Sequence, residues 1–372
     1  MNWAAKQEKD ITTTRPAPPD QAAKLRYLRQ QINPATIDPS RPILVTGGTG
    51  FIGSYIIREL LQKGYAVRAL RRGTALPAYI GADLLTRVEW VEGDVLDLVS
   101  LEDAMTGVDA VIHAAAVVSF HRRDTKRMHQ VNVEGTAHVV NTALEAGVRR
   151  LVHVSSVAAL GRSGTGGQVD EEKKWEDSRL NTAYAISKHR AEMEVWRAIA
   201  EGLEAVIVNP STVLGFGDWN RSSCRLFKSA FESFPWYSNG VNGFVCIGDV
   251  ARATVLLMES PLTAERYILN GENWRFRDLF NCMADAFGTR RPVREATPLL
   301  AALAWRLERV RSLFTGKPPL LTRESARVAN SHTYFTNQKI RDALPGFSFT
   351  PLKACIENAC KSYLQAINSP VR

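Results

Sequence analysis

The chain has 372 residues, of which 45% are hydrophobic and 23% charged, and its formal net charge is +9. This length suffices for a large buried core, organised as one large domain or two closely associated ones. The sequence shows no apolar run long enough to span a bilayer, no secretory signal and no nucleic-acid-binding motif. We therefore expect a globular protein of the cytoplasm.

Much of the positive charge is concentrated in residues 290–330, which contain nine basic and three acidic residues. The simplest explanation for this charge is a basic surface exposed to solvent. The functional alternative is that the segment binds an anionic substrate or an anionic membrane surface. The five cysteines include no C-x-x-C pair. They predict neither a disulfide framework nor a metal site, which fits a reducing compartment.

Residues 1–40 are rich in proline and polar residues, which predicts a mostly disordered extension. Within it, Leu25, Leu28 and Ile32 recur at helical spacing and favour a short helix over residues 20–32.

The stretch from Ile43 to Gly53 has the pattern of a buried strand, a glycine-rich turn and the start of a helix. Backbone N–H groups at such a helix N-terminus bind an anion, here a dinucleotide pyrophosphate. We expect Gly47 to permit the tight turn, Gly50 to let the backbone approach the phosphates, and Gly53 to let the helix pack on the strand. The cofactor-binding residues predicted here are Gly47, Gly50, Phe51, Ile52 and Gly53.

Short aliphatic strands alternate with helices as far as residue 210, which is typical of a parallel sheet covered on both faces. The fold class predicted is α/β, a Rossmann-type doubly wound parallel sheet over residues 41–210, with ligands bound beyond the carboxyl ends of the strands. The predicted strands cover 43–45, 66–70, 88–91, 110–114, 151–154 and 205–208, and the predicted helices cover 54–62, 130–146 and 184–201.

The alternation stops after residue 210. We expect residues 211–372 to form mainly a smaller, largely helical substrate-binding domain that is partly interleaved with the first. Thr297 and Pro298 supply the N-cap and the first-turn residue of a helix over 298–314. That helix is amphipathic, and we expect its apolar face to pack on the core rather than on a lipid surface.

Arg71 and Arg72 follow the second predicted strand, 18 and 19 residues beyond Gly53. An acidic residue at this position binds the ribose 2′-hydroxyl of NAD. Guanidinium groups pair instead with a 2′-phosphate, so NADP(H) is the predicted cofactor and NAD(H) is the alternative. Two solvated arginines are the simpler interpretation.

Two further segments follow predicted strands. Asp94 is placed to accept a hydrogen bond from an adenine amino group and Val95 to pack on the ring, although loop aspartates commonly only form turns. Small side chains after the fourth strand leave room for the cofactor's ribose and pyrophosphate, although they also suit close packing. These small residues are Ala114, Ala115 and Ala116.

Tyr184 and Lys188 are four residues apart in a predicted helix and therefore share one face. A phenol with a pKa near 10 is a poor proton shuttle at neutral pH. A nearby ammonium lowers that pKa by favouring the phenolate, and the same lysine reaches the nicotinamide ribose. Ser156, after the fifth strand, is placed to hydrogen-bond a substrate carbonyl and to stabilise the developing oxyanion.

In combination these motifs resemble the extended short-chain dehydrogenase/reductases, over about residues 42–365. The resemblance is closest to the dihydroflavonol-reductase-like branch of the NAD-dependent epimerase/dehydratase family. The segments that carry it are Thr46–Gly53, Val131–Thr136, Ser155 with Ser156, Tyr184 with Lys188, and Asn209–Gly215.

The resemblance implies a role for each matched residue. Tyr184 would be the acid/base, Lys188 its electrostatic partner and Ser156 the carbonyl-orienting group, with Ser155 as the alternative. Asn132 would hold a water molecule that links Lys188 to solvent. The carboxamide side of the nicotinamide would be lined by Pro210, Ser211, Thr212 and Val213.

Two departures from the family pattern reduce the number of reactions that the chain is expected to catalyse. Sugar-nucleotide dehydratases carry acidic residues directly after the serine or threonine, whereas Val157 and Ala158 stand here and argue against dehydration. The epimerases present an acidic residue to NAD after the second strand, where this chain has Arg71 and Arg72.

The function predicted is hydride transfer between NADP(H) and a carbonyl or secondary alcohol, with Tyr184 as acid/base. One alternative is an NAD-dependent sugar-nucleotide epimerase or a 3-beta-hydroxysteroid-dehydrogenase-like enzyme. Another, of a different class, is a non-catalytic dinucleotide-binding sensor or scaffold.

Aromatic residues follow the sixth strand, where this family builds its substrate wall, and ordinary core packing explains them equally well. The partner predicted is a small apolar or aromatic carbonyl or alcohol. Homodimers are common in the family, but the sequence carries no interface signature. The aromatic residues are Phe216, Trp219, Phe231, Phe234, Trp236 and Tyr237.

Overall fold

The computed structural model describes residues 37–77, 79–161, 167–178, 181–315, 326, 327 and 329–368. From Ile37 onward the chain forms one compact unit. The helix predicted over residues 20–32, and the predicted extension up to residue 36, lie outside the described residues.

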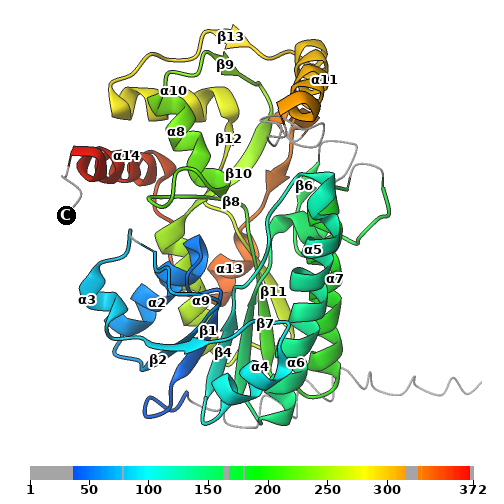
Figure 1. Ribbon diagram of the computed structural model, residues 1–372, viewed down its shortest axis with the longest axis vertical. Helices are drawn as coiled ribbons and strands as arrows, with labels where there is room; N and C mark the ends of the chain where they lie inside the picture. Colours follow the sequence, from blue (N-terminus) through cyan, green and yellow to red (C-terminus); the bar gives the residue numbers. More distant parts are fainter. Residues whose placement is uncertain are drawn as a thin grey trace, which may run out of the picture. The chain divides into compact units, whose positions relative to one another are not determined.

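Seven strands form the central sheet, in the order β11-β7-β5-β4-β1-β2-β3 (Figure 1). All neighbouring strands in it are parallel, so the predicted Rossmann-type sheet is confirmed. The strand order reverses between β1 and β4, where open α/β sheets bind their ligands. The strands are β1 (Ile43–Thr46), β2 (Val67–Arg71), β3 (Glu89–Glu92), β4 (Ala110–His113), β5 (Arg150–Val154), β7 (Ala205–Pro210) and β11 (Glu265–Leu269).

Alternating side chains along each strand divide the core into two layers. In β1, Ile43 and Val45 pack in one layer and Leu44 in the other. Helices α2 (Phe51–Gln62) and α9 (Ile247–Glu259) cover the first face of the sheet (Figure 1). The second face is covered by α4 (Leu98–Met105), α6 (Gly135–Glu145) and α7 (Ala183–Ala200).

The edge strand β11 comes from the second half of the chain, after the predicted alternation stops. It pairs with β7 from Glu265 opposite Val206 to Leu269 opposite Pro210. Its first two residues, Glu265 and Arg266, are charged, because an edge strand is covered on one side only. This strand therefore lacks the continuous aliphatic run that marked the other strands.

The remaining elements build a second region with its own core, beyond the carboxyl ends of the central strands (Figure 1). A three-stranded sheet, β12-β10-β8, supports helices whose apolar side chains meet around Phe227, Phe244 and Leu279. The elements are β8 (Thr212–Leu214), α8 (Arg225–Phe231), β10 (Val241–Cys246), β12 (Glu272–Arg275), α10 (Phe276–Phe287) and α14 (Leu352–Asn368). Smaller elements are α3 (Ala82–Leu85), α5 (Thr125–His129), β6 (Gln168–Val169), β9 (Trp236–Tyr237), β13 (Arg294–Glu295), β14 (Tyr334–Phe335) and α13 (Gln338–Ala343).

Cys246, at the end of β10, and Cys355, in α14, form a disulfide. The expectation drawn from the cysteine pattern is therefore wrong on this point. The two cysteines are 109 residues apart in the sequence, so no local spacing marks the pair.

Helix α11 (Pro298–Thr315) begins where the sequence predicts, and the N–H of Leu300 donates to the Thr297 hydroxyl (3.4 Å). The expectation that its apolar face packs on the core is wrong for Leu299, Leu303 and Leu307, which are 84%, 55% and 61% exposed. The core of the second region is filled by α8, α10 and α14 instead. Among the described helices, none is long and apolar enough to cross a bilayer.

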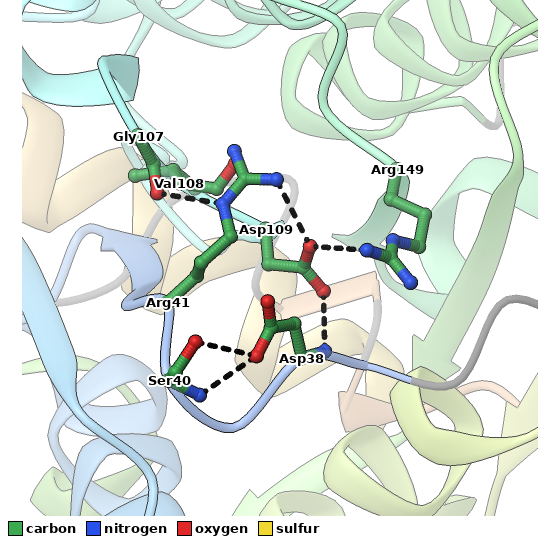
Figure 2. A network of polar contacts seen from close by, with 7 residues as sticks. All are labelled: Asp38, Ser40, Arg41, Gly107, Val108, Asp109 and Arg149. Atoms are coloured by element: carbon green, nitrogen blue, oxygen red, sulfur yellow. Dashed lines mark hydrogen bonds and ion pairs between the residues drawn. The ribbon is translucent and has the colours of Figure 1, made fainter.

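The segment that precedes β1 is attached to the sheet through Asp109, whose side chain is fully buried (Figure 2). The Asp109 carboxylate accepts the N–H of Asp38 (2.8 Å) and pairs with Arg149 (3.0 Å) and Arg41 (3.4 Å). Arg41 also donates to the carbonyl of Val108 (2.8 Å). Residues 38–41 are thus fixed to the sheet, and the predicted disordered extension to residue 40 is wrong for its last residues.

Candidate active site

The turn after β1 leaves no room for side chains. Gly47 has φ +71°, and a Cβ on it would lie 2.6 Å from the backbone nitrogen of Ala115. A Cβ on Gly50 would lie 3.1 Å from the Gly47 carbonyl oxygen, and one on Gly53 would collide with the same atom. The turn is therefore bare backbone that touches the loop after β4, at the reversal point of the strand order.

The N-terminus of α2 is open to an anion. Gly50 is its N-cap, no acidic side chain lies in its first turn, and no side chain caps it. The first helical residues, Phe51 and Ile52, are half-buried, and the Phe51 ring packs edge-on against Tyr55 (5.8 Å between centroids). Such a terminus, together with the side-chain-free turn, fits a pyrophosphate.

The two predicted arginines at the end of β2 differ in surroundings. Arg71 is the last residue of β2, and its carbonyl accepts the N–H of Gly93 (2.9 Å). Arg72 lies beyond the strand with its side chain 58% exposed and forms an ion pair with Asp94 (3.8 Å). The structure thus brings together Arg72 and Asp94, two residues predicted separately.

The other residues predicted near the adenine and ribose lie close to β1 and β4. Val95 is buried in the second core layer. The N–H of Ala114 donates to the carbonyl of Thr46 (3.1 Å) and that of Ala115 to its hydroxyl (3.4 Å). Ala114 and Ala115 are half-buried and Ala116 is exposed, so this loop borders the glycine turn without filling it.

Tyr184 lies in the first turn of α7, which is capped by the Thr182 hydroxyl accepting the N–H of Ala185 (3.0 Å). The Ser156 side chain lies close enough to the Tyr184 phenol to lower its pKa, against the effect of burial. Ser156 follows β5 and caps a short helix, where its hydroxyl accepts the N–H of Ala158 (3.2 Å). The neighbouring Ser155 is buried, so Ser156 is the serine that meets the phenol.

Lys188, one turn beyond Tyr184, is 2% exposed, and its ammonium donates to the carbonyl of Val154 (3.0 Å). Burial lowers the pKa of Lys188 to about 8, and the carboxylate of Glu192 opposes that change. Burial also raises the pKa of Tyr184, opposed by the Ser156 hydrogen bond. The expected lowering of the phenol pKa is therefore not what the structure shows, because burial outweighs the other influences on Tyr184.

Asn132 lies in a π-helical turn, Gln130–Glu134, and is 1% exposed. Its oxygen accepts the N–H of Val117 (2.7 Å), and its nitrogen donates to the carbonyl of Val117 (3.0 Å) and to the hydroxyl of Ser187 (3.0 Å). It therefore joins the loop after β4 to α7, and its role toward a water molecule stays a prediction.

The segment that follows β7 is partly buried. Pro210 ends the strand, and the N–H of Ser211 donates to the carbonyl of Leu269 (3.0 Å). The Thr212 hydroxyl accepts from the amide of Asn242 (2.8 Å), and Val213 is buried. The Ser211 hydroxyl is buried without a hydrogen-bond partner among the described residues.

Residues 43–270 match the model of the NAD dependent epimerase/dehydratase family. The chain belongs to this family. It is 32% identical over 325 residues to a putative dihydroflavonol 4-reductase of Synechocystis sp., covering 85% of this chain and 92% of the relative. It is 31% identical over 345 residues to cinnamoyl-CoA reductase 1 of Petunia hybrida, covering 88% of this chain and 94% of the relative.

Among solved structures, the crystal structure of gox2253 superposes with a TM-score of 0.74 at 31% identity, covering 88% of this chain and 98% of that one. The resemblance to the extended short-chain dehydrogenase/reductases is thus confirmed, and the named relatives are reductases.

Several polar residues that the motifs of the family did not single out surround Lys188. His113 is buried between the hydroxyls of Thr46 (2.7 Å) and Thr136 (3.0 Å), and burial lowers its pKa to about 3. Glu192 lies one turn beyond Lys188 on α7 and accepts a hydrogen bond from Asn209, the first residue of the 209–215 motif (2.6 Å). The sequence signal for Glu192 was available: it follows Lys188 by one helical turn, as Lys188 follows Tyr184.

The aromatic residues assigned to the substrate wall of the family divide into two groups. Phe216, Trp219 and Phe231 pack against the core of the second region, as ordinary packing predicts. Phe234 is 53% exposed, and Trp236 in β9 lies under the guanidinium of Arg294 (5.6 Å).

Proposed function

We propose that this protein is an NADP(H)-dependent carbonyl reductase or alcohol dehydrogenase. The observation that supports this most strongly is the buried ammonium of Lys188, which donates to the carbonyl of Val154 at the carboxyl end of β5 (3.0 Å). This places Lys188 beside the loop that carries Ser156 and one helical turn from Tyr184 on α7. A hydroxyl pair next to a cation is suited to holding a carbonyl oxygen and transferring a proton to it.

The residues that would hold the dinucleotide are those around the bare turn after β1. The turn from Gly47 to Gly53 would bind the pyrophosphate, the 114–116 loop would border the ribose, and Arg71 and Arg72 would face the 2′-phosphate. Val95, Asp94 and the 210–213 segment complete the proposed cofactor site. When bound, the nicotinamide supplies hydride to a carbonyl carbon, or accepts it in the reverse direction.

The chain's own residues would act on the substrate oxygen. Ser156 donates a hydrogen bond to the carbonyl oxygen and orients it, and Tyr184 gives that oxygen its proton. Lys188 would favour the ionised phenol through its positive charge, the role that the family resemblance implies, whereas in the cofactor-free chain burial raises the pKa of Tyr184. Asn132 fixes the loop after β4 to α7 and would hold a water molecule near Lys188.

The substrate proposed is an apolar or aromatic carbonyl compound, the class to which the names of the reductase relatives point. Val157 and Ala158, directly after Ser156, offer no acid to protonate a leaving hydroxyl, so reduction rather than dehydration is proposed. Residues 41–210 would mainly bind the cofactor and residues 211–372 mainly the substrate.

Replacing Tyr184 by Phe tests the assignment. Loss of the proton donor is expected to lower kcat by about 100-fold or more, while the affinity for NADPH changes little. Activity is followed by NADPH absorbance with a panel of aldehydes, cinnamoyl-CoA, dihydroflavonols and steroid ketones, and binding by NADPH fluorescence.

The matched control is Tyr65→Phe, which removes a phenol bonded to Glu259 (3.0 Å) away from the site and is expected to leave kcat unchanged. Full activity of Tyr184→Phe on the best substrate would remove Tyr184 from the mechanism.

A further inference from the structure

Helix α7 carries three polar side chains on one face at successive turns: Tyr184, Lys188 and Glu192. Glu192 is completely buried. A carboxylate in a protein interior is costly unless it is paired and hydrogen-bonded. The groups that contact the Glu192 carboxylate therefore indicate its role.

Glu192 is held from two neighbouring strands. Its Oε1 accepts a hydrogen bond from the amide nitrogen of Asn209, at the end of β7 (2.6 Å). Its Oε2 makes no hydrogen bond within the described residues and lies 3.6 Å from the guanidinium of Arg266, on β11. Arg266 is itself fixed by the backbone carbonyls of Glu171 (2.8 Å) and Lys173 (3.0 Å). The carboxylate is thus held by a short hydrogen bond from Asn209 and a longer ion pair with Arg266, and the Ser155 side chain also favours its ionised form.

The charge of Glu192 acts on Lys188. Burial alone would drive the lysine toward its neutral form, and among the described residues Glu192 is the carboxylate whose charge opposes this. The rings of His113 and His153 also interact with Lys188, and burial lowers the pKa of both, so they add no second positive charge beside the ammonium. Glu192, one turn along the same face of α7, is therefore the group placed to favour a protonated Lys188.

Glu192 also reaches the substrate-orienting serine through Asn209. The amide nitrogen of Asn209 donates both to Glu192 (2.6 Å) and to the backbone carbonyl of Ser156 (3.0 Å). The amide can make both bonds only while it points toward the carboxylate. Glu192 therefore acts on Lys188 through its charge, and its hydrogen bond with Asn209 connects it to the loop that carries Ser156.

We propose that Glu192 is a positioning residue that keeps Lys188 protonated and, through Asn209, fixes the loop that carries Ser156. The inference rests on the proposed function for its consequence in catalysis, but its electrostatic part concerns the cofactor-free chain alone. Burial raises the pKa of Glu192, while Ser155, Asn209, Arg266 and Lys188 oppose that rise and favour the ionised form.

The polar groups that face this pair come from every element packed around it. They are His113 on β4, His153 on β5, Ser155 directly after β5, Asn209 on β7 and Arg266 on β11.

The test is the titration of Lys188 in cofactor-free protein labelled with ε-13C lysine, its resonance assigned by its loss in Lys188→Arg. In Glu192→Gln the amide oxygen still accepts from Asn209, so the geometry is kept and only the charge is lost. The Lys188 midpoint is expected near pH 8 in the wild type and about one pH unit lower in Glu192→Gln. An unchanged midpoint would overturn the proposal, because it would mean that Glu192 is neutral or does not act on Lys188.

The matched control is Glu194→Gln, on the same helix, whose carboxylate pairs with Arg197 (3.1 Å) rather than with Lys188. It is expected to leave the Lys188 midpoint in place. Should Glu192→Gln fail to fold, Glu192→Asp keeps the charge one methylene farther away and is expected to give a smaller downward shift. A higher midpoint in Glu192→Asp than in the wild type would then overturn the proposal, because moving the negative charge away cannot favour the ammonium.

The catalytic consequence is measured separately, once a substrate is known. The alkaline limb of kcat/KM is expected to move to lower pH in Glu192→Gln by the shift seen in the titration. A uniform loss of kcat at all pH values would reveal a merely structural role. If no substrate is reduced by the wild type, the proposed function fails while the titration still decides the electrostatic part.

Discussion

At the scale of single residues, the surroundings of Arg72 decide how a 2′-phosphate could bind. Its guanidinium is more than half exposed, and its ion pair with Asp94 is long, at 3.8 Å. Exposed pairs of this kind contribute at most about 1 kcal/mol. A phosphate with up to two negative charges would therefore replace the Asp94 carboxylate at little cost.

Replacing Arg72 by Ala is expected to weaken NADPH binding by about 10-fold and to leave NADH binding unchanged, because a charge-assisted hydrogen bond contributes roughly 1.5–3 kcal/mol and exposure reduces it. Fluorescence titration of both nucleotides measures this. Arg291→Ala is the matched control, since that arginine is also exposed (60%) and also paired with an aspartate, Asp285 (2.7 Å). Equal losses of NADPH and NADH affinity in Arg72→Ala would contradict a contact with the 2′-phosphate.

The position of Lys188 could be predicted from the sequence, but the groups that set its pKa could be predicted only in part. Helical spacing places the lysine on the face of Tyr184, and the structure agrees. The same spacing places Glu192 one turn farther along that face. Spacing does not reveal that a strand carbonyl, that of Val154, accepts from the ammonium, or that Asn209 and Arg266 hold the Glu192 carboxylate. Those partners come from pairing across the sheet and from burial, which depend on residues far away in the sequence.

At the scale of elements, two neighbouring helices of the second half behave in opposite ways. Helix α10 buries Leu279 and Met283 completely in the core of the second region. Helix α11 presents Leu299, Leu303 and Leu307, one turn apart, to the outside. Identical leucine substitutions in the two helices therefore measure packing separately from helix propensity.

Leu279→Ala is expected to lower the free energy of unfolding by about 2–5 kcal/mol, because it opens a cavity in a closed core. Leu303→Ala, the matched control, is expected to stay within about 0.5 kcal/mol of the wild type. Urea unfolding followed by circular dichroism measures both. A loss in Leu303→Ala as large as that in Leu279→Ala would show that this face of α11 is covered in solution.

The elements that could be predicted from sequence are those whose physics is local. Six strands of the central sheet are short aliphatic runs, because parallel strands are buried on both faces. The glycine turn at 47–53 was predictable because the backbone conformation itself requires glycine. β11 was missed because it starts with Glu265 and Arg266 and lies outside the region where strands and helices alternate. The Cys246–Cys355 disulfide was missed because its partners are 109 residues apart.

At the scale of the whole molecule, the candidate site is assembled from distant parts of the chain. Gly47 follows β1, Ser156 follows β5, Lys188 lies on α7 and Asn209 ends β7. The site therefore depends on the order of strands in the sheet, which the alternation of strands and helices predicted only as a class. Folding brings these parts together and buries Lys188, and the burial of its ammonium affects the free energy of unfolding.

The variant Lys188→Met measures how the buried ammonium affects the free energy of unfolding. In the unfolded chain the lysine keeps its ordinary pKa of 10.5, whereas in the folded chain the pKa is about 8. Between these values the unfolded chain binds more protons than the folded one, so the contribution of Lys188 to the free energy of unfolding rises with pH. The cost of burying the ammonium is complete below pH 8 and is gone above pH 10.5. The stability advantage of Lys188→Met over the wild type should therefore shrink by about 3 kcal/mol across this window.

Urea unfolding of cofactor-free protein at several values between pH 7 and 10.5 gives this difference directly. Lys353→Met is the matched control, because the side chain of Lys353 is 72% exposed and its replacement should not alter how stability depends on pH. A constant difference between wild type and Lys188→Met throughout the range would mean that the folded protein does not pay for a buried ammonium at this position. In that case Lys188 would have no need of Glu192, and the electrostatic arrangement along α7 would have to be reassigned.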